Sequence, residues 1–263
     1  EAPGAMALVT IGCGADSNPS PRGGADGGLA FAKQYGGEIG AEVKRLLGLS
    51  FTPLKSRLST RSKEIQLPYG PHFTRDQWLA RSTNSGIVGY HAKKWLARLE
   101  RGEKLPDSLY YPITTWNFGN ELALVFLPGE VVVDYAVRLK SELDGQHLWV
   151  SGYANYVPCY IPSRRILAEG GYEAEDSLWY YDRPARLSTN VEDLIVTTVR
   201  GLVPKSFHRD PKRADLPPAH RAHLLVGQVV DAPSGQQDLA AGDAAGRLQQ
   251  ADDGGAGHRL AGA

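Results

Sequence analysis

An abrupt change in composition at Pro204 limits which part of this chain can build a core. All five Trp and all twelve Tyr residues precede Pro204, and the residues after it include one aromatic, Phe207, and no Ile. Ordering a backbone costs about 1–2 kcal/mol per residue, which a segment with so little to bury does not offset. We therefore expect residues 1–203 to fold and residues 204–263 to form a low-complexity tail.

Two explanations fit the tail. It is a disordered segment, or it is the product of a shifted reading frame in GC-rich DNA, which favours Ala, Gly, Arg, Asp and Pro. His220 and His223 lie in this segment. Because nothing around them predicts an ordered structure, we do not interpret them as a metal-binding pair.

Charge and hydropathy exclude several kinds of partner. Lys plus Arg and Asp plus Glu both number 29, so the chain offers no electrostatic attraction for nucleic acid or an anionic membrane. No apolar run approaches the roughly 20 residues needed to cross a bilayer.

Cys13 and Cys159 are too few for a disulfide scaffold. Both lie in loops that could form one site, so we state as a hypothesis that the two cysteines lie close enough to form a disulfide.

The beginning of the chain resembles the interior of a domain. Glu1 is not an initiator Met, and no signal peptide pattern follows it. Residues 5–11 instead predict a short buried strand that ends in a Gly-rich turn. We expect the chain to be a fragment that further sequence precedes.

The pattern between residues 29 and 203 predicts alternating helices and strands. Helices are expected at residues 29–47, after Thr74, at 91–101, after Glu130, after Ser163 and at 190–203. Strands are expected at residues 54–67, 111–117, 122–127, 148–153 and 178–181, with 118–120 as a hairpin turn. This order predicts an α/β fold with a mixed β-sheet flanked by helices.

Three places in this pattern could carry chemistry. Loops after strands, near Gly14 and Tyr160, are common sites in helix-flanked sheets. Glu130 is expected where a strand gives way to a helix, whose N-terminus favours an ionised carboxylate. Tyr153, Tyr156, Tyr160 and Tyr172 lie within twenty residues of one another. Each feature also has a plain explanation, since Glu is common at helix starts and tyrosines often serve in packing.

Three segments in order resemble the neutral and alkaline non-lysosomal ceramidase family, most closely its divergent bacterial members. They are residues 12–22 (GCGADSNPSPR), residues 126–135 (FLPGEVVVDY), and residues 152–162 (GYANYVPCYIP) followed by 171–173 (GYE). The resemblance spans roughly residues 5–203. It implies a ceramidase-like catalytic domain, a small lipid-amide substrate and a secreted or periplasmic location.

The resemblance also implies a zinc site. The family cleaves the amide of ceramide into sphingosine and a fatty acid, and two His, one Glu and one Tyr hold its zinc. Glu130 and Tyr160 match the last two ligands, and Tyr172 matches a tyrosine at the scissile amide. Ser17 matches a serine of the ceramidase site. Zinc acidifies bound water and polarises a carbonyl, while a phenol can stabilise the developing oxyanion.

The chain departs from the family pattern in three respects. The two histidine ligands are expected upstream of Glu1, and neither His72 nor His91 stands in a matching context. The surroundings of Ser17 are altered, and a turn or capping role also fits it. The C-terminal sandwich domain of the ceramidases has no counterpart. We therefore expect weak zinc binding and poor turnover from this chain alone.

Two other functions remain open. A non-catalytic binding domain on the same fold would explain the altered loop around Ser17. Hydrolysis of a different amide or ester is the other, because no residue identifies an acyl-chain pocket. The sequence carries no feature that sets an oligomeric state.

Overall fold

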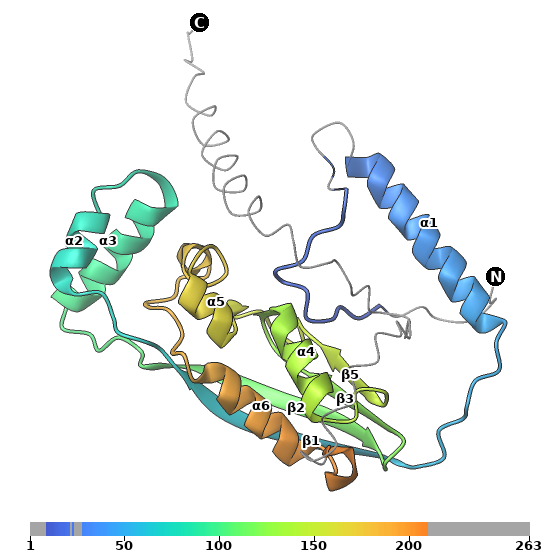
Figure 1. Ribbon diagram of the computed structural model, residues 1–263. Helices are drawn as coiled ribbons and strands as arrows, with labels where there is room; N and C mark the ends of the chain where they lie inside the picture. Colours follow the sequence, from blue (N-terminus) through green and yellow to red (C-terminus); the bar gives the residue numbers. More distant parts are fainter. Residues whose placement is uncertain (1–8, 22, 24–27, 210–263) are drawn as a thin grey trace, which may run out of the picture.

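A computed structural model describes residues 9–21, 23 and 28–209 of the chain. Figure 1 shows a twisted sheet with helices along one side and other helices further from it. Residues 1–8 and 210–263 lie outside the described residues, and with them lie most of the expected first strand, nearly all of the expected tail, and His220 and His223.

A four-stranded mixed sheet is the centre of the fold, in the order β1-β2-β3-β5. Strands β1 (Leu58–Pro68) and β2 (Ser108–Phe118) pair antiparallel, and the predicted hairpin joins β2 to β3 (Leu122–Phe126). Strand β5 (Leu148–Ser151) then pairs parallel with β3. The prediction of a mixed sheet is confirmed.

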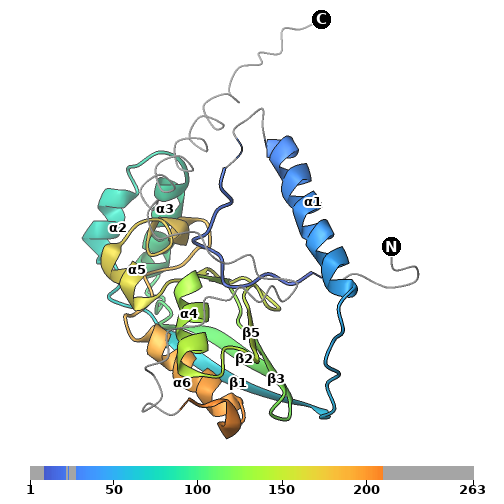
Figure 2. The same ribbon diagram turned by 45° about the vertical axis from the view of Figure 1, so that its right-hand side comes forward.

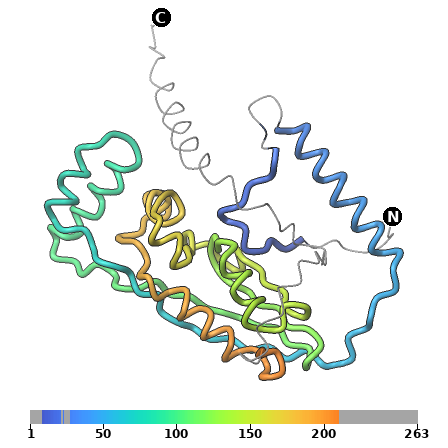
Figure 3. The backbone as a smooth tube through the Cα atoms, viewed as in Figure 1, coloured from blue at the N-terminus to red at the C-terminus, as the bar shows by residue number. Residues whose placement is uncertain are grey.

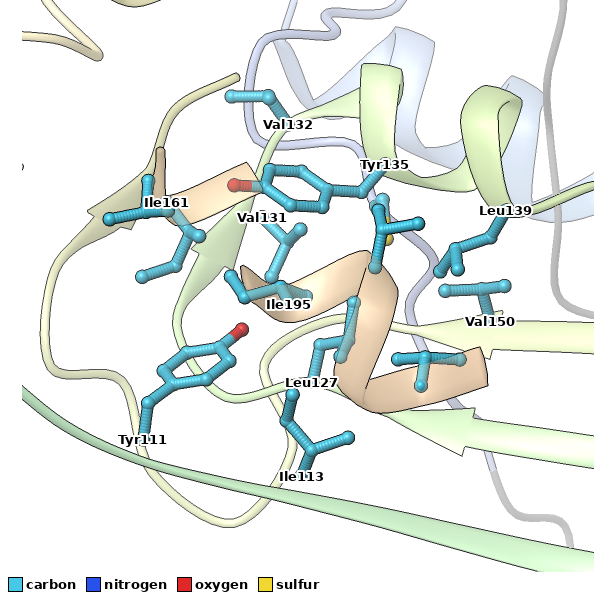
Figure 4. Close-up of a cluster of buried hydrophobic side chains, with 14 of the residues drawn as sticks. Tyr111, Ile113, Leu127, Val131, Val132, Tyr135, Leu139, Val150, Ile161 and Ile195 are labelled. Atoms are coloured by element: carbon cyan, nitrogen blue, oxygen red, sulfur yellow. The ribbon is translucent and has the colours of Figure 1, made fainter. Parts of the chain in front are cut away.

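One face of this sheet carries the main core. Alternate residues of β2 are buried, while Tyr110 and Trp116 on the other face are more than 40% exposed. Helices α4 (Val133–Glu142) and α6 (Val191–Leu202) cover the buried face. In Figure 4, Tyr135 and Leu139 of α4 and Ile195 of α6 point toward Ile113, Leu127 and Val150.

A second, smaller sheet lies beside the first. Strand β4 (Glu130–Val131) pairs parallel with β6 (Tyr160–Ile161). Helix α5 (Arg164–Glu169) follows, with Ser163 accepting a hydrogen bond from the N–H of Ile166 as predicted. The strand predicted at residues 178–181 is wrong, because a 3₁₀ helix, η1 (Asp176–Trp179), forms there instead.

Helices α2 (Arg75–Arg81) and α3 (Gly86–Glu100) form a pair with a core of its own. Figure 3 shows the chain leaving β1, forming this pair and returning to β2. Thr74 caps α2 through reciprocal hydrogen bonds with Gln77, which confirms the predicted capped helix. The hydrophobic core of this pair consists of Trp78, Ala92, Trp95 and Leu96, together with Leu105 from the segment after α3.

The first helix stands apart from these cores. Helix α1 (Gly28–Leu47) forms where the apolar period predicts it, yet it has no buried residue. Figure 2 shows it separated from the sheet. The described end of the predicted first strand, residues 9–11, is neither strand nor buried. That part of the prediction is wrong, because among the described residues the backbone of 9–11 makes one such bond, in which Ile11 accepts from Gly152, the residue after β5.

The packed region continues past Pro204. A 3₁₀ turn, η2 (Lys205–Phe207), follows α6 and buries Phe207 in the main core. The carbonyl of Phe207 accepts a hydrogen bond of 2.8 Å from the N–H of Asp144.

Across the described ranges, no helix is both long and apolar enough to cross a membrane.

Candidate functional site

The pairing of β4 with β6 brings Glu130 opposite Tyr160. The residue before β4, Gly129, has φ 85°, a left-handed conformation that favours glycine. A Cβ atom at Gly129 would lie 2.8 Å from the carbonyl oxygen of Cys159. The two strands can therefore approach only because residue 129 has no side chain.

Tyrosine hydroxyls hold both carboxylate oxygens of Glu130. Tyr153 donates to Oε2 over 3.1 Å, and Tyr181 donates to Oε1. Since a carboxylate accepts several hydrogen bonds, each oxygen keeps a further lone pair for another partner. The position of the Glu130 side chain is thus fixed by residues 23 and 51 positions further along the chain.

Ring contacts join two more tyrosines, Tyr160 and Tyr172, to Tyr181, which holds this carboxylate. The ring of Tyr160 meets Tyr172 edge-on at 5.4 Å between centroids, and meets Tyr181 at 6.1 Å. We call Glu130 with Tyr153, Tyr160, Tyr172 and Tyr181 the Glu130–tyrosine cluster. All five residues are half-buried.

Burial is the main cause that keeps the phenols of this cluster protonated. Desolvation, with the charge of Glu130 adding to it, raises the pKa of Tyr153 to about 12. The same two causes raise the pKa of Tyr160, and desolvation together with the hydrogen bond to Glu130 raises the pKa of Tyr181. Burial also raises the pKa of Tyr172. At neutral pH each phenol is therefore a hydrogen-bond donor, and Tyr160 would need a bound cation beside it to ionise.

Strained backbone surrounds the cluster. Among the described non-glycine residues, those with positive φ are Tyr153 (55°), Asn155 (67°) and Asp182 (52°). Two lie in the loop that carries Tyr153, and Asp182 follows Tyr181 directly. Left-handed non-glycine residues cost free energy and concentrate at functional sites. Their position therefore favours this cluster as the functional site.

A strand gives way to a helix after Glu130 as predicted, but the Glu130 carboxylate does not stand at the N-terminus of that helix. Glu130 lies in β4, and α4 begins three residues later, at Val133. The first N–H of that helix, at Val133, instead donates to Oδ1 of Asp16 over 2.8 Å. The loop of Asp16 is also attached to β4, since Ala15 donates to the carbonyl of Val131.

Ser17 lies outside the cluster. Its side chain is exposed, and its N–H donates to the carbonyl of Gly14 in a turn. Within the described part of the chain, no hydrogen bond joins Ser17 to Glu130 or to the four tyrosines. The arrangement fits the turn role that the sequence left open for this serine.

The histidines and cysteines of the described region have other surroundings. His91 is buried in α3, where burial lowers its pKa to about 4. His72 lies edge-on to Tyr69, at 6.3 Å between ring centroids. Cys13 and Cys159 are both buried and free, so they form no disulfide. Over residues 9–21, 23 and 28–209, no three His, Cys, Asp or Glu side chains form a metal-binding group.

Glu130 and Tyr160 suit zinc by their chemistry. A carboxylate and a phenolate are oxygen donors, and a zinc site needs three or four ligands in all. The cluster therefore supplies half of such a site. Sequence reasoning proposed Glu130, Tyr160 and Tyr172 as site residues but missed the contacts of Tyr153 and Tyr181 with Glu130. The spacing of Tyr153 within the aromatic segment was the available signal.

Comparison with known proteins adds no assignment: no family model, curated protein or solved structure matches the chain.

Proposed function

We propose that this chain is part of a zinc-dependent amidohydrolase of the neutral ceramidase type. Its substrate would be ceramide or a related N-acyl lipid amide. The observation that carries the proposal is the pairing of Glu130 with Tyr160 across β4 and β6, with Tyr172 against the Tyr160 ring. Residues that the resemblance assigns to one site, and that are up to 42 positions apart, lie together in the fold.

Each residue of the cluster has a role in this proposal. Glu130 and Tyr160 would hold zinc together with two histidines expected upstream. Bound zinc supplies an acidified water and polarises the carbonyl of the amide. Tyr172 keeps its proton at neutral pH and can donate to the oxygen that becomes negative during attack. Tyr153 and Tyr181 orient the Glu130 carboxylate.

A non-catalytic binding domain on the same fold is the second candidate. The exposed side chain of Ser17 favours it, because in the described part of the chain this serine forms no hydrogen bond to Glu130 or Tyr172. A hydrolase for another amide or ester is chemically compatible with the same residues.

Zinc titration and hydrolysis of a fluorogenic N-acyl amide test the proposal. We expect the chain alone to bind zinc weakly, and the chain carrying its upstream histidines to bind one zinc and hydrolyse the amide. Glu130→Ala should abolish both properties. Bound zinc without hydrolysis would favour the binding domain, and tight zinc binding that survives Glu130→Ala would contradict the assigned site.

A further inference from the structure

The segment that carries Tyr181 is held by the α2–α3 pair. Just before Tyr181, the ring of Trp179 is 9% exposed and lies 5.2 Å from the His91 ring of α3. The guanidinium of Arg81, at the end of α2, lies 4.8 Å over the same Trp179 ring. Both helices of the pair therefore contact the residue two positions before Tyr181.

The pair also holds the residues after Tyr181. Lys94 of α3 forms an ion pair with Asp182, whose backbone is left-handed with φ 52°. Nε2 of His91 lies 3.0 Å from the carbonyl oxygen of Arg183. Contacts on both sides of Tyr181 thus fix the strained turn that points its hydroxyl at Glu130.

Arg183 extends this connection to Tyr160. Its Nε donates a hydrogen bond of 2.9 Å to the carbonyl of Pro158, two residues before Tyr160 in β6. The segment held by α3 is therefore bonded to the loop that leads into the strand opposite Glu130. Figure 1 shows α2 and α3 standing beside this region rather than on the main sheet.

We propose that the α2–α3 pair is a positioning unit for the Glu130–tyrosine cluster. It holds residues 179–183 so that Tyr181 restrains the Glu130 carboxylate, and Lys94 is its positioning residue. The alternative is that the pair only stabilises the fold. The two explanations differ in one outcome: only a positioning role predicts that loss of the Lys94–Asp182 ion pair changes the environment of Tyr181 without unfolding the protein.

Fluorine NMR of the metal-free chain, labelled with 3-fluorotyrosine, tests the positioning directly. Tyr181→Phe identifies the Tyr181 resonance by its loss. In Lys94→Met we expect this resonance to move toward the position of free 3-fluorotyrosine, while thermal unfolding stays close to that of the parent. Lys93→Met, which removes an exposed lysine next to it on α3, is the matched control and should leave the resonance in place. An unmoved Tyr181 resonance in Lys94→Met would overturn the proposal.

The consequence for zinc affinity rests on the proposed function, so it has its own readout. With Zn²⁺ as probe, Lys94→Met should weaken binding about three- to tenfold in the parent and cause no further loss in Tyr181→Phe. Additive losses would show that Lys94 does not act through Tyr181 and would overturn the proposal. If the Tyr181 resonance moves while zinc fails to bind even with the upstream histidines present, the positioning stands and the proposed function fails.

Discussion

Tyr153 donates a hydrogen bond of 3.1 Å to Oε2 of Glu130 from a backbone in the left-handed region, with φ 55°. A tyrosine in this conformation is strained, so the surrounding contacts must hold it there. Its N–H donates to the carbonyl of Gly129, and the N–H of Ala154 donates to the carbonyl of Leu127. These bonds attach the Tyr153 loop to the turn that presents Glu130.

Tyr153→Phe should weaken this arrangement while leaving the loop in place. The variant keeps the ring and loses the hydroxyl, and a hydrogen bond of this kind contributes about 0.5–1.5 kcal/mol, more where the acceptor is charged. We expect the free energy of unfolding in urea to fall by about 1 kcal/mol. Tyr90→Phe, at an exposed position of α3, is the control and should leave it unchanged. An equal loss in both variants would contradict the importance of the Tyr153–Glu130 bond.

Gly129→Ala should destabilise the protein by about 1–3 kcal/mol. The new Cβ atom would lie 2.8 Å from the carbonyl oxygen of Cys159, at a residue with φ 85°. Gly201→Ala is a matched control, because a Cβ atom on this residue of α6 meets nothing within 4 Å. Alanine is the better helix former, so the control should gain up to about 1 kcal/mol. Thermal unfolding of the two variants should move in opposite directions.

The hairpin and the capped helices were predictable because their signals are local. Two largely apolar runs define β2 and β3, and the turn at Gly119 between them has the required positive φ. Thr74 and Ser163 accept hydrogen bonds from the first turns of their own helices. Each of these structures needs only residues close together in the chain.

The Glu130–tyrosine cluster was predictable only in part because tertiary contacts set it. Strands β4 and β6 have two residues each, too few for a periodic pattern. Residues 178–181 resemble a strand in sequence, yet Trp179 packs against His91 and the backbone bonds locally, with Ser177 donating to Tyr172. No sequence pattern states that Tyr181 then reaches Glu130, 51 residues earlier.

Replacing Asp16 by alanine should destabilise the protein, whereas replacing Ser17 by alanine should not. Asp16 accepts from the first N–H of α4, and loss of such a cap costs about 0.5–2 kcal/mol. Asp16→Ala should therefore lower the free energy of unfolding by about 1 kcal/mol, while Asp16→Asn keeps an acceptor oxygen and should lower it less. Ser17→Ala, at an exposed turn position, should have almost no effect in the same urea titration. A loss for Ser17→Ala as large as for Asp16→Ala would assign Ser17 a role beyond the turn.

The two buried thiols should make the fold sensitive to alkaline pH. Burial raises the pKa values of Cys13 and Cys159 from an ordinary value near 9 to about 12. Between these values the unfolded chain has lost protons that the folded chain keeps. The contribution to stability is therefore complete below pH 9 and is lost as pH rises toward 12, by up to about 1.4 kcal/mol per pH unit for each thiol.

Urea unfolding at pH 8, 9 and 10 measures this dependence. Tyrosines with raised pKa values add to the same trend, so the informative quantity is the difference in slope between the parent and Cys13→Ala. The variant should lose stability less steeply above pH 9, because one of the two thiols no longer titrates. In the folded parent at pH 8, both thiols should also react slowly with Ellman's reagent and rapidly in urea, since only a thiolate attacks it. Equal slopes together with rapid reaction of the folded protein would show that Cys13 is open to solvent, contrary to its place in the main core.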